Sequence, residues 1–243
     1  MPDSASFNNL VENYAGLEGR DLIKTAVRNH AGKVALLSSF GAESSVLLHM
    51  VSEIEPDMPV LFLDTEKLFP ETLLYRDKLV QELGLSNVIT LSPDAGDLAK
   101  LDADGFLNQR DKDACCHIRK TLPMQKAFED FDVIISGRKR FHGALRSQLE
   151  FVSVQDDQLK LEPLAAFSAL DLQGYMQRHH LPSHPLKLQG WRSIGCVPCT
   201  TAGGTDEDPR AGRWSGTEKT ECGIHFSANG QIIRTVTRPA AGV

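Results

Sequence analysis

The sequence predicts an α/β protein whose mostly parallel sheet carries helices on both faces. Short continuous runs of apolar residues, bounded by polar turns, are typical of strands that are buried on both sides. Such runs lie at 34–37, 60–63, 88–91 and 133–136. Before and between these runs, at 7–29, 46–52 and 71–83, the apolar residues are spaced as in a helix. Strands that alternate with helices form βαβ units, and such units build a parallel sheet.

The remainder of the chain is less regular. Gly84 is expected to end the third helix, and 92–114 is polar and without clear periodicity. The elements expected after it are a helix at 115–120, a further helix that starts near Thr121 and Pro123, a hairpin at 151–161 and a helix at 170–178. From residue 181 onward, glycine, proline and charge predict loops. We therefore expect one large α/β domain over 1–205 and a mobile, loop-rich C-terminal segment over 206–243.

Composition and charge exclude several classes of protein. Hydrophobic residues make up 41% and charged residues 24% of the chain, as is ordinary for a soluble globular protein. The net charge of −6 argues against general binding of nucleic acid through a basic surface. The first residues lack a secretion signal, and no apolar run approaches the ~18 residues that a membrane span needs. We therefore expect a cytoplasmic protein with no nucleic-acid or membrane partner.

Basic residues gather at two places on this acidic chain. One group is 138–140 with Arg146, and the other is Arg210 with Arg213. Such groups are either solvated surface or an anion-binding pocket. Composition alone leaves both interpretations open.

Four of the five cysteines form two pairs that predict a metal site. Cys115 and Cys116 are adjacent, and Cys196 and Cys199 form a C-x-x-C. In a reducing compartment, metal binding or catalysis is favoured over disulfides. Four thiols match the ligand count of an iron–sulfur cube or of a tetrathiolate zinc. Consecutive helical residues point about 100° apart, which favours a broad cube over one small ion. Zinc, a redox pair and inert buried thiols remain alternatives.

The fifth cysteine, Cys222, is a candidate nucleophile. Lys219, Glu221 and His225 flank it. A free thiol has a pKa near ~8.5, and a neighbouring cation lowers that pKa toward the working pH. The alternative is an ordinary exposed cysteine.

Polar motifs follow three of the predicted strands. They begin after residues 37, 63 and 136. Ligands of parallel sheets sit at the carboxyl ends of the strands, so we expect these motifs to form one site. In the first motif, Ser38, Gly41 and Ser44 suit an anion beside a helix N-terminus. The motif lacks the G-K-[ST] of a Walker A loop, and its spacing alone also fits an ordinary βα loop.

These motifs resemble those of a known family. SSFGAESS (38–45) looks like the PP-loop of the adenine-nucleotide α-hydrolase-like superfamily, in its sulfonucleotide-reductase variant. The pattern continues, in the family's order, in LDTEKLFPET (63–72), CCHIRK (115–120), SIGCVPCT (193–200), RAGRW (210–214) and KTECGIH (219–225). Over about 36–225 the chain is similar to the assimilatory adenylyl-sulfate (APS) reductases of bacterial type. The resemblance implies a Rossmann-like, PP-loop fold.

The same resemblance implies a cofactor, a substrate and partners. It implies one [4Fe–4S] cluster held by Cys115, Cys116, Cys196 and Cys199. It implies APS as substrate rather than the 3′-phosphorylated form, PAPS, with reduced thioredoxin or a glutaredoxin-like donor as reductant, and AMP as a product. A homo-oligomer is compatible with it.

The resemblance also implies roles for individual residues. Cys222 is the implied nucleophile, with His225 beside it, and Lys120 links the charge of the cluster to the sulfate. The implied substrate-binding residues are Ser38, Gly41, Ser44, Leu63, Thr65, Arg138, Arg146, Arg210 and Arg213. In the implied reaction Cys222 attacks the sulfur of APS, and a thioredoxin thiol then releases sulfite from the resulting S-sulfocysteine.

Three other functions compete with this one. The first is reduction of PAPS. The second is a PP-loop ATP pyrophosphatase, although such enzymes usually carry a fuller S-G-G-x-D-S loop where this chain has Phe40 and Glu43. The third is not an enzyme but a four-cysteine zinc module that binds a partner.

One basic loop departs from the family's pattern, G-x-R-R-x-Q-S-x-T-R. Lys139 replaces the first arginine, and His142, Gly143 and Leu145 stand where glutamine, serine and threonine would. Arg146 aligns with the final arginine. Contacts made by the missing residues therefore do not transfer to this chain.

Overall fold

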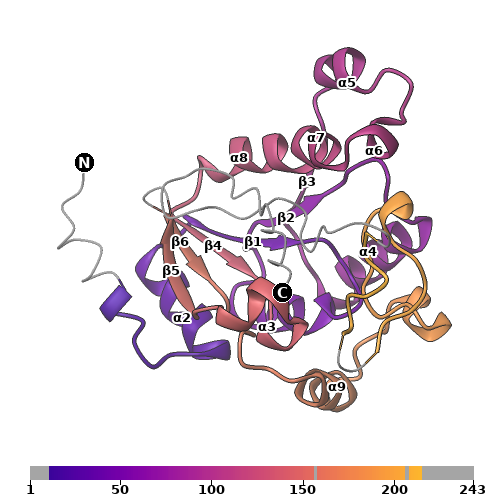
Figure 1. The fold of residues 1–243 in the computed structure, drawn as a ribbon. Coiled ribbons are helices and arrows are strands. Elements are labelled where there is room, and N and C mark those ends of the chain that lie inside the picture. The colour runs from indigo at the N-terminus through magenta and orange to yellow at the C-terminus, as the bar shows by residue number, and fades with distance from the viewer. Residues whose placement is uncertain (1–10, 156–157, 206–207, 215–243) are drawn as a thin grey trace, which may run out of the picture.

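A six-stranded sheet forms the centre of the protein (Figure 1). The computed structural model describes residues 11–155, 158–205 and 208–214. The strands are β1 (Val34–Ser38), β2 (Val60–Leu63), β3 (Val88–Leu91), β4 (Val133–Ser136), β5 (Val152–Gln155) and β6 (Gln158–Leu161). Their order is β3-β2-β1-β4-β6-β5; all neighbours are parallel except the β5–β6 pair. The predicted strands and the hairpin are confirmed.

Alternate residues of the central strands enter two different cores. Val34 and Leu36 of β1 belong to a large core with residues of α2, α3, α4 and α9. Ala35 packs in a smaller core with Met124 and Phe128 of α8. Figure 1 shows α8 on one side of the sheet and α2, α3 and α9 on the other. This two-sided burial explains why the strands are continuous apolar runs rather than alternating ones.

Eight helices occur in the described part of the chain. Their bounds are α2 (Gly19–Asn29), α3 (Ser44–Ile54), α4 (Pro70–Leu83), α5 (Ala95–Leu101), α6 (Leu107–Arg110), α7 (Lys112–Cys116), α8 (Leu122–Phe128) and α9 (Ala169–Arg178). Helix α4 ends at Gly84, which adopts the left-handed conformation (φ 62°) that favours glycine, as predicted. No helix in the described residues is long and apolar enough to span a membrane.

Two parts of the predicted secondary structure differ from the structure. The single helix expected over 7–29 is broken, because the chain turns at 13–16 and α2 starts only at Gly19. The stretch expected to be irregular, 92–114, contains α5 and α6. Asp94 caps α5 by accepting from the amides of Gly96 and Asp97. A polar sequence concealed these helices because they are short and mostly exposed.

The helix predicted near Thr121 and Pro123 is present, since α8 starts at Leu122, but it is not separate from the helix before it. A π-helical turn, His117–Thr121, joins α7 directly to α8, and Thr121 itself is helical without a side-chain cap. Proline has no amide hydrogen to donate. Its absence is tolerated here because Pro123 lies in the first turn of α8, directly after the wider π-helical turn. The Cys115–Cys116 pair and Lys120 therefore lie on one continuous helical rod.

The strand order places a crevice between β1 and β4. From β1 the chain builds outward through β2 and β3, and it then returns to the other side of β1 with β4. In open α/β sheets, ligands bind at the carboxyl ends of strands where the order reverses in this way. The loops that follow β1 and β4 are 39–43 and 137–139.

The described part of the C-terminal region lies over this edge. It contains the short 3₁₀ turns η4 (Pro185–Gln189) and η5 (Val197–Cys199) and no longer helix, as its loop-rich sequence predicts. Residues 208–214 are joined to it, since Thr200 and Arg213 form an antiparallel bridge. The predicted nucleophile, Cys222, lies outside the described residues.

Candidate active site

A cavity of about 340 Å³ opens at the carboxyl ends of β1 and β4. The structure brings together around it every predicted substrate-binding residue: Ser38, Gly41, Ser44, Leu63, Thr65, Arg138, Arg146, Arg210 and Arg213. Lys120 lines it as well. His225, like Cys222, belongs to the part of the chain that the structure does not describe.

The loop after β1 is held in a fixed shape by its own hydrogen bonds. The Ser44 hydroxyl donates to the Gly41 carbonyl at 2.8 Å, and the Phe40 amide donates to the Ser38 hydroxyl at 3.2 Å. Phe40 adopts a positive φ of 48°, which is uncommon for a bulky residue. Its ring is fully buried and packs edge-on against Phe62 of β2 at 5.3 Å. The aromatic residue that interrupts the glycine pattern thus anchors the loop in the core.

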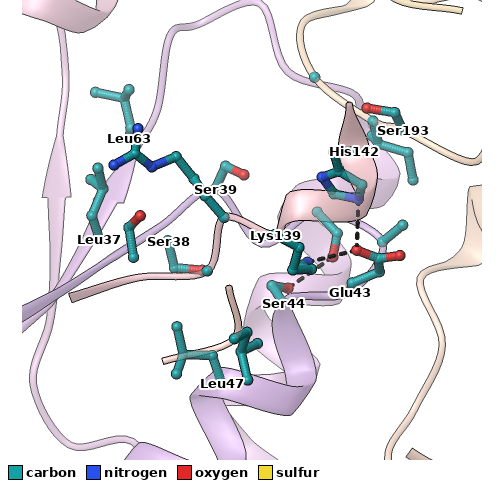
Figure 2. A pocket seen from close by; sticks show the side chains of 18 of the residues that line it. Leu37, Ser38, Ser39, Glu43, Ser44, Leu47, Leu63, Lys139, His142 and Ser193 are labelled. Carbon is teal, nitrogen blue, oxygen red and sulfur yellow. Dashed lines mark hydrogen bonds and ion pairs between the residues drawn. The ribbon is translucent and has the colours of Figure 1, made fainter. Parts of the chain in front are cut away.

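Glu43 is a half-buried acid that joins this loop to the basic loop after β4. Lys139 Nζ lies 2.6 Å and His142 Nε2 lies 3.2 Å from Glu43 Oε2. Figure 2 shows both basic side chains pointing at the carboxylate. Burial alone raises the pKa of Glu43, but the charge of Lys139 and the hydrogen bond from His142 outweigh it and hold the pKa well below its usual range. The charge of Glu43 is therefore already matched within the protein.

A second acid, Glu162, is buried and fixes the start of the basic loop. Arg138 Nε donates to Glu162 Oε1 at 2.7 Å, and the Ser136 hydroxyl donates to Oε2 at 2.7 Å. Glu162 is 2% exposed, whereas the Arg138 side chain is 28% exposed. Arg138 therefore lines the cavity while its guanidinium is paired with the Glu162 carboxylate.

Arg213 lies against the opposite wall. Its guanidinium stacks over the Trp214 ring at 4.4 Å and passes directly beside the backbone of Gly195. A Cβ atom at Gly195 would lie 2.3 Å from an Arg213 nitrogen, so only glycine leaves room for this path. Trp214 is buried, and its amide donates to the Cys199 carbonyl at 3.0 Å. The cavity and the cysteine region are joined through these residues.

The four paired cysteines line one small cavity behind the first one. Cys115 and Cys116 end α7, Cys196 directly precedes η5, and Cys199 is its last residue. All four are free thiols, and the Thr65 hydroxyl lies 3.2 Å from Cys196 Sγ. Thr65 and Lys120 line both cavities, so the two sites share a wall.

The donor set suits a soft metal centre. Burial raises the pKa of the Cys115 thiol, and the nearby Cys196 and Cys199 raise it further. Thiolates gathered in this way repel one another unless positive charge lies between them. Among the described residues, no group of three or more His, Cys, Asp or Glu side chains is arranged to hold a single metal ion.

Arg119 and Asp102 form a buried ion pair beside the cysteines, and this pair is not apparent from the sequence. Arg119 donates to Asp102 Oδ2 through Nε at 3.1 Å and NH2 at 2.6 Å. Its NH1 donates to the Thr65 carbonyl at 2.9 Å. Asp102 Oδ1 also accepts from the Leu107 amide at 2.7 Å. The pair ties the cysteine-bearing rod to the end of β2 and to α6.

Several other residues of the cavity were not among the predicted substrate-binding residues. These are Ser39, Glu43, Lys139, His142, Glu162, Arg192 and Ser193. Their partners lie far away in the sequence; Glu43 and Lys139, for example, are 96 residues apart. The one available signal was the density of basic residues at 138–140.

Comparison with known proteins identifies the family. The model of the phosphoadenosine phosphosulfate reductase domain matches residues 33–202, which is most of the chain. The chain belongs to this family. Among curated members of the reductase family, a protein of Mesorhizobium japonicum named adenosine 5′-phosphosulfate reductase is 43% identical over 215 residues, which cover 88% of this chain and 85% of the relative. A protein of the same name from Chelativorans sp. is 42% identical over 215 residues, 88% of each chain.

Solved structures support the reductase fold. A phosphoadenylyl-sulfate (PAPS) reductase from Candida auris, in a phosphate complex, superposes with a TM-score of 0.67 at 19% identity. The match covers 83% of this chain and 98% of that one. An FMN adenylyltransferase of Candida glabrata superposes with a TM-score of 0.53 at 14% identity, over 75% and 62% of the two chains. At these identities the likeness concerns the fold alone. The predicted family and the predicted α/β fold are both confirmed.

Proposed function

We propose that this chain reduces APS to sulfite and AMP in assimilatory sulfate reduction, with thioredoxin or a similar dithiol as donor. As a member of its family it is an oxidoreductase that acts on a sulfur group. The observation that carries the proposal is the shared wall: the cavity lined by basic residues meets the four-cysteine cavity at Thr65 and Lys120. The names of its relatives at 43% and 42% identity favour APS.

The proposed chemistry has two balanced steps. The Cys222 thiolate attacks the sulfur of APS, the bond from sulfur to the bridging oxygen breaks, and AMP leaves with the electron pair. A donor thiolate then attacks Cys222 Sγ and releases sulfite, which carries away the electrons of the S–S bond. The second donor thiol resolves the mixed disulfide. Sulfur(VI) is reduced to sulfur(IV), and the dithiol becomes a disulfide.

Positive charge is needed where an anionic nucleophile meets an anionic substrate. We assign Arg210, Arg213, Lys120 and His225 to the sulfate group. Ser38, Gly41, Ser44, Arg138 and Arg146 are assigned to the phosphate and ribose of AMP, and Leu63 and Thr65 to the adenosine. All of these except His225 line the described cavity.

Cys115, Cys116, Cys196 and Cys199 would hold the [4Fe–4S] cluster. Their soft donors and common cavity fit such a group. When bound, the cluster would supply a fixed charge and rigidity, since thiol chemistry already balances the electrons. Lys120 lies on the same helical rod as Cys116 and reaches both cavities, so its ammonium is suited to link the two sites.

The PP-loop ATP pyrophosphatases are disfavoured by the state of Glu43. This residue stands at the acid position of their loop, but here its carboxylate is paired with Lys139 and His142. A carboxylate whose charge is matched in this way is a poor ligand for magnesium. Heat protection by magnesium ATP, and none by APS, would favour that alternative.

The proposed function is tested by sulfite release from APS and from PAPS, with reduced thioredoxin and anaerobically purified protein. We expect release from APS and little from PAPS. Iron and acid-labile sulfide are measured on the same sample, because one zinc and no iron would favour the zinc module. No sulfite from either nucleotide, with iron and fold intact, would contradict the proposed function.

A Gly195→Ala variant is expected to lose activity without unfolding. The added methyl group would meet only the flexible end of Arg213, which can move away and would then leave the sulfate. Loss of a hydrogen bond to a charged group corresponds to a roughly 10- to 100-fold fall in kcat/KM for APS. The control is Gly174→Ala, where a Cβ meets no atom within 4 Å. Unchanged kcat/KM would remove Arg213 from the site.

A further inference from the structure

His142 bridges a carboxylate and a guanidinium at the nucleotide cavity. Its Nε2 lies 3.2 Å from Glu43 Oε2, and its Nδ1 lies 3.2 Å from an Arg146 NH1 nitrogen. The side chain is 13% exposed, and all three residues line the cavity. His142 ends η2 (Arg140–His142), and Arg146 lies in the next turn, η3 (Ala144–Gln148). Figure 2 shows the ring pointing toward Glu43.

The two partners determine which ring nitrogen carries the hydrogen. An ionised carboxylate only accepts hydrogen bonds, and a guanidinium only donates them. Nε2 must therefore carry the hydrogen, and Nδ1 must offer its lone pair to Arg146. This arrangement requires a neutral ring. A proton on Nδ1 would set two donors against each other and would break the contact with Arg146.

Burial and two neighbouring cations keep the ring neutral near pH 7. Burial is the largest influence and lowers the pKa of His142 below its ordinary value. The neighbouring Lys139 and Arg146 lower it as well, whereas the hydrogen bond to Glu43 and its charge raise it. The bridge is therefore complete at neutral pH and is lost as the pH falls through that lowered pKa.

The family pattern has glutamine where this chain has His142. A glutamine amide can donate to Glu43 through its NH₂ group and accept from Arg146 through its carbonyl, and it does not titrate. Histidine makes the same two contacts only in its neutral form. This substitution turns a contact that is independent of pH into one that depends on it.

We propose that His142 is a positioning residue that holds the Arg146 guanidinium toward the nucleotide phosphate and so makes nucleotide binding weaken in acid. The inference rests on the proposed function, because it requires the cavity to bind an adenine nucleotide. His142 acts through Arg146 and touches no reacting atom.

The test is calorimetric binding of AMP to the full-length protein, purified anaerobically, between pH 8 and pH 5.5. Wild type is compared with His142→Gln and His142→Ala. AMP itself titrates in this range, but its titration is common to all samples and cancels in ratios of Kd. The exposed His180, whose φ of 51° asparagine tolerates, supplies the control variant His180→Asn.

We expect wild type and His142→Gln to bind AMP equally at pH 8. Toward pH 5.5 the wild-type Kd should rise relative to that of His142→Gln, and the rise should approach about tenfold only where the ring is fully protonated. His142→Ala should bind about tenfold more weakly at pH 8 and should follow the pH profile of His142→Gln. His180→Asn should follow wild type throughout. Rescue by glutamine, together with loss of the pH response, distinguishes positioning of Arg146 from a general effect on the fold.

Two outcomes would overturn the inference. Parallel pH profiles for wild type and His142→Gln would mean that His142 does not carry the response. Wild-type affinity in His142→Ala would mean that Arg146 needs no bridge. Either outcome leaves the proposed function standing if wild type releases sulfite from APS. Failure of wild type to bind AMP at any pH would overturn the inference and the proposed function together.

Discussion

A Cys222→Ser variant is expected to release no sulfite from APS while it binds AMP as wild type does. A serine hydroxyl stays protonated at neutral pH and cannot carry the SO₃ group to a thiol, so both proposed steps fail. Removal of a covalent nucleophile costs at least ~10³-fold in kcat. AMP binding should be spared because the residues assigned to AMP, which line the described cavity, are all unchanged in this variant.

The measurement is sulfite release with excess thioredoxin, together with mass spectrometry of protein incubated with APS alone. Wild type should gain the mass of one SO₃ group on the peptide that contains Cys222, and the variant should gain none. Equal AMP affinity and equal iron content serve as controls. Sulfite release at the wild-type rate from Cys222→Ser would show that another group attacks the sulfur.

An Arg119→Met variant is expected to be the least stable single substitution near the cysteines. It would leave the Asp102 carboxylate, whose side chain is 0% exposed, with only the Leu107 amide as a partner. Breaking a buried ion pair in this way costs about 3–5 kcal/mol, or roughly 6–20 °C in Tm for a chain of this size. The rod that carries Cys115 and Cys116 would also lose its tie to the Thr65 carbonyl, so iron content should fall.

The matched control is Arg110→Met, which removes an exposed pair with Asp104 from the same region. It should leave Tm almost unchanged, because exposed ion pairs contribute little. The double variant Arg119→Met with Asp102→Asn should recover part of the loss, since no unpaired charge remains. The prediction is wrong if Arg119→Met and Arg110→Met melt together.

The pH dependence of stability gives an independent check of the same pair. Burial raises the pKa of Asp102, but hydrogen bonds from the Leu107 amide and from Arg119 lower it below its ordinary value. A carboxylate with a lowered folded-state pKa stabilises the protein above its unfolded pKa, near ~3.9, and this contribution is lost as the pH falls further. Arg119→Met should therefore lose less stability than wild type between about pH 5 and pH 3.

The sheet could be predicted because its signal is local. Each central strand is a short apolar run that enters two cores, and the helices between the strands have their own period. Helices α5 and α6 escaped prediction since their stability comes from caps such as Asp94 and from packing beside the cysteine rod rather than from an apolar stripe. The continuity of the helical rod 112–128 was not predicted. Pro123 normally signals a helix boundary, but here a π-helical turn joins α7 to α8 just before it.

The lining of the cavity was predictable where the residue types suit an anion and not where side chains contact one another. Serines, glycines and arginines at strand ends indicate an anion site by their type. The charged partners of Glu43, Glu162 and Asp102 lie 96, 24 and 17 residues away, respectively, and no short motif contains both members of a pair. Only the folded chain makes Glu43 a counterion for the basic loop instead of a metal ligand.

The common wall formed by Thr65 and Lys120 has a thermodynamic consequence. Two ligands that touch the same side chains are linked, and linkage is reciprocal. If a filled cysteine site tightens nucleotide binding by some factor, then bound nucleotide must tighten retention of whatever the cysteines hold by the same factor. In that case nucleotide should slow the loss of that group, and one coupling factor describes both effects.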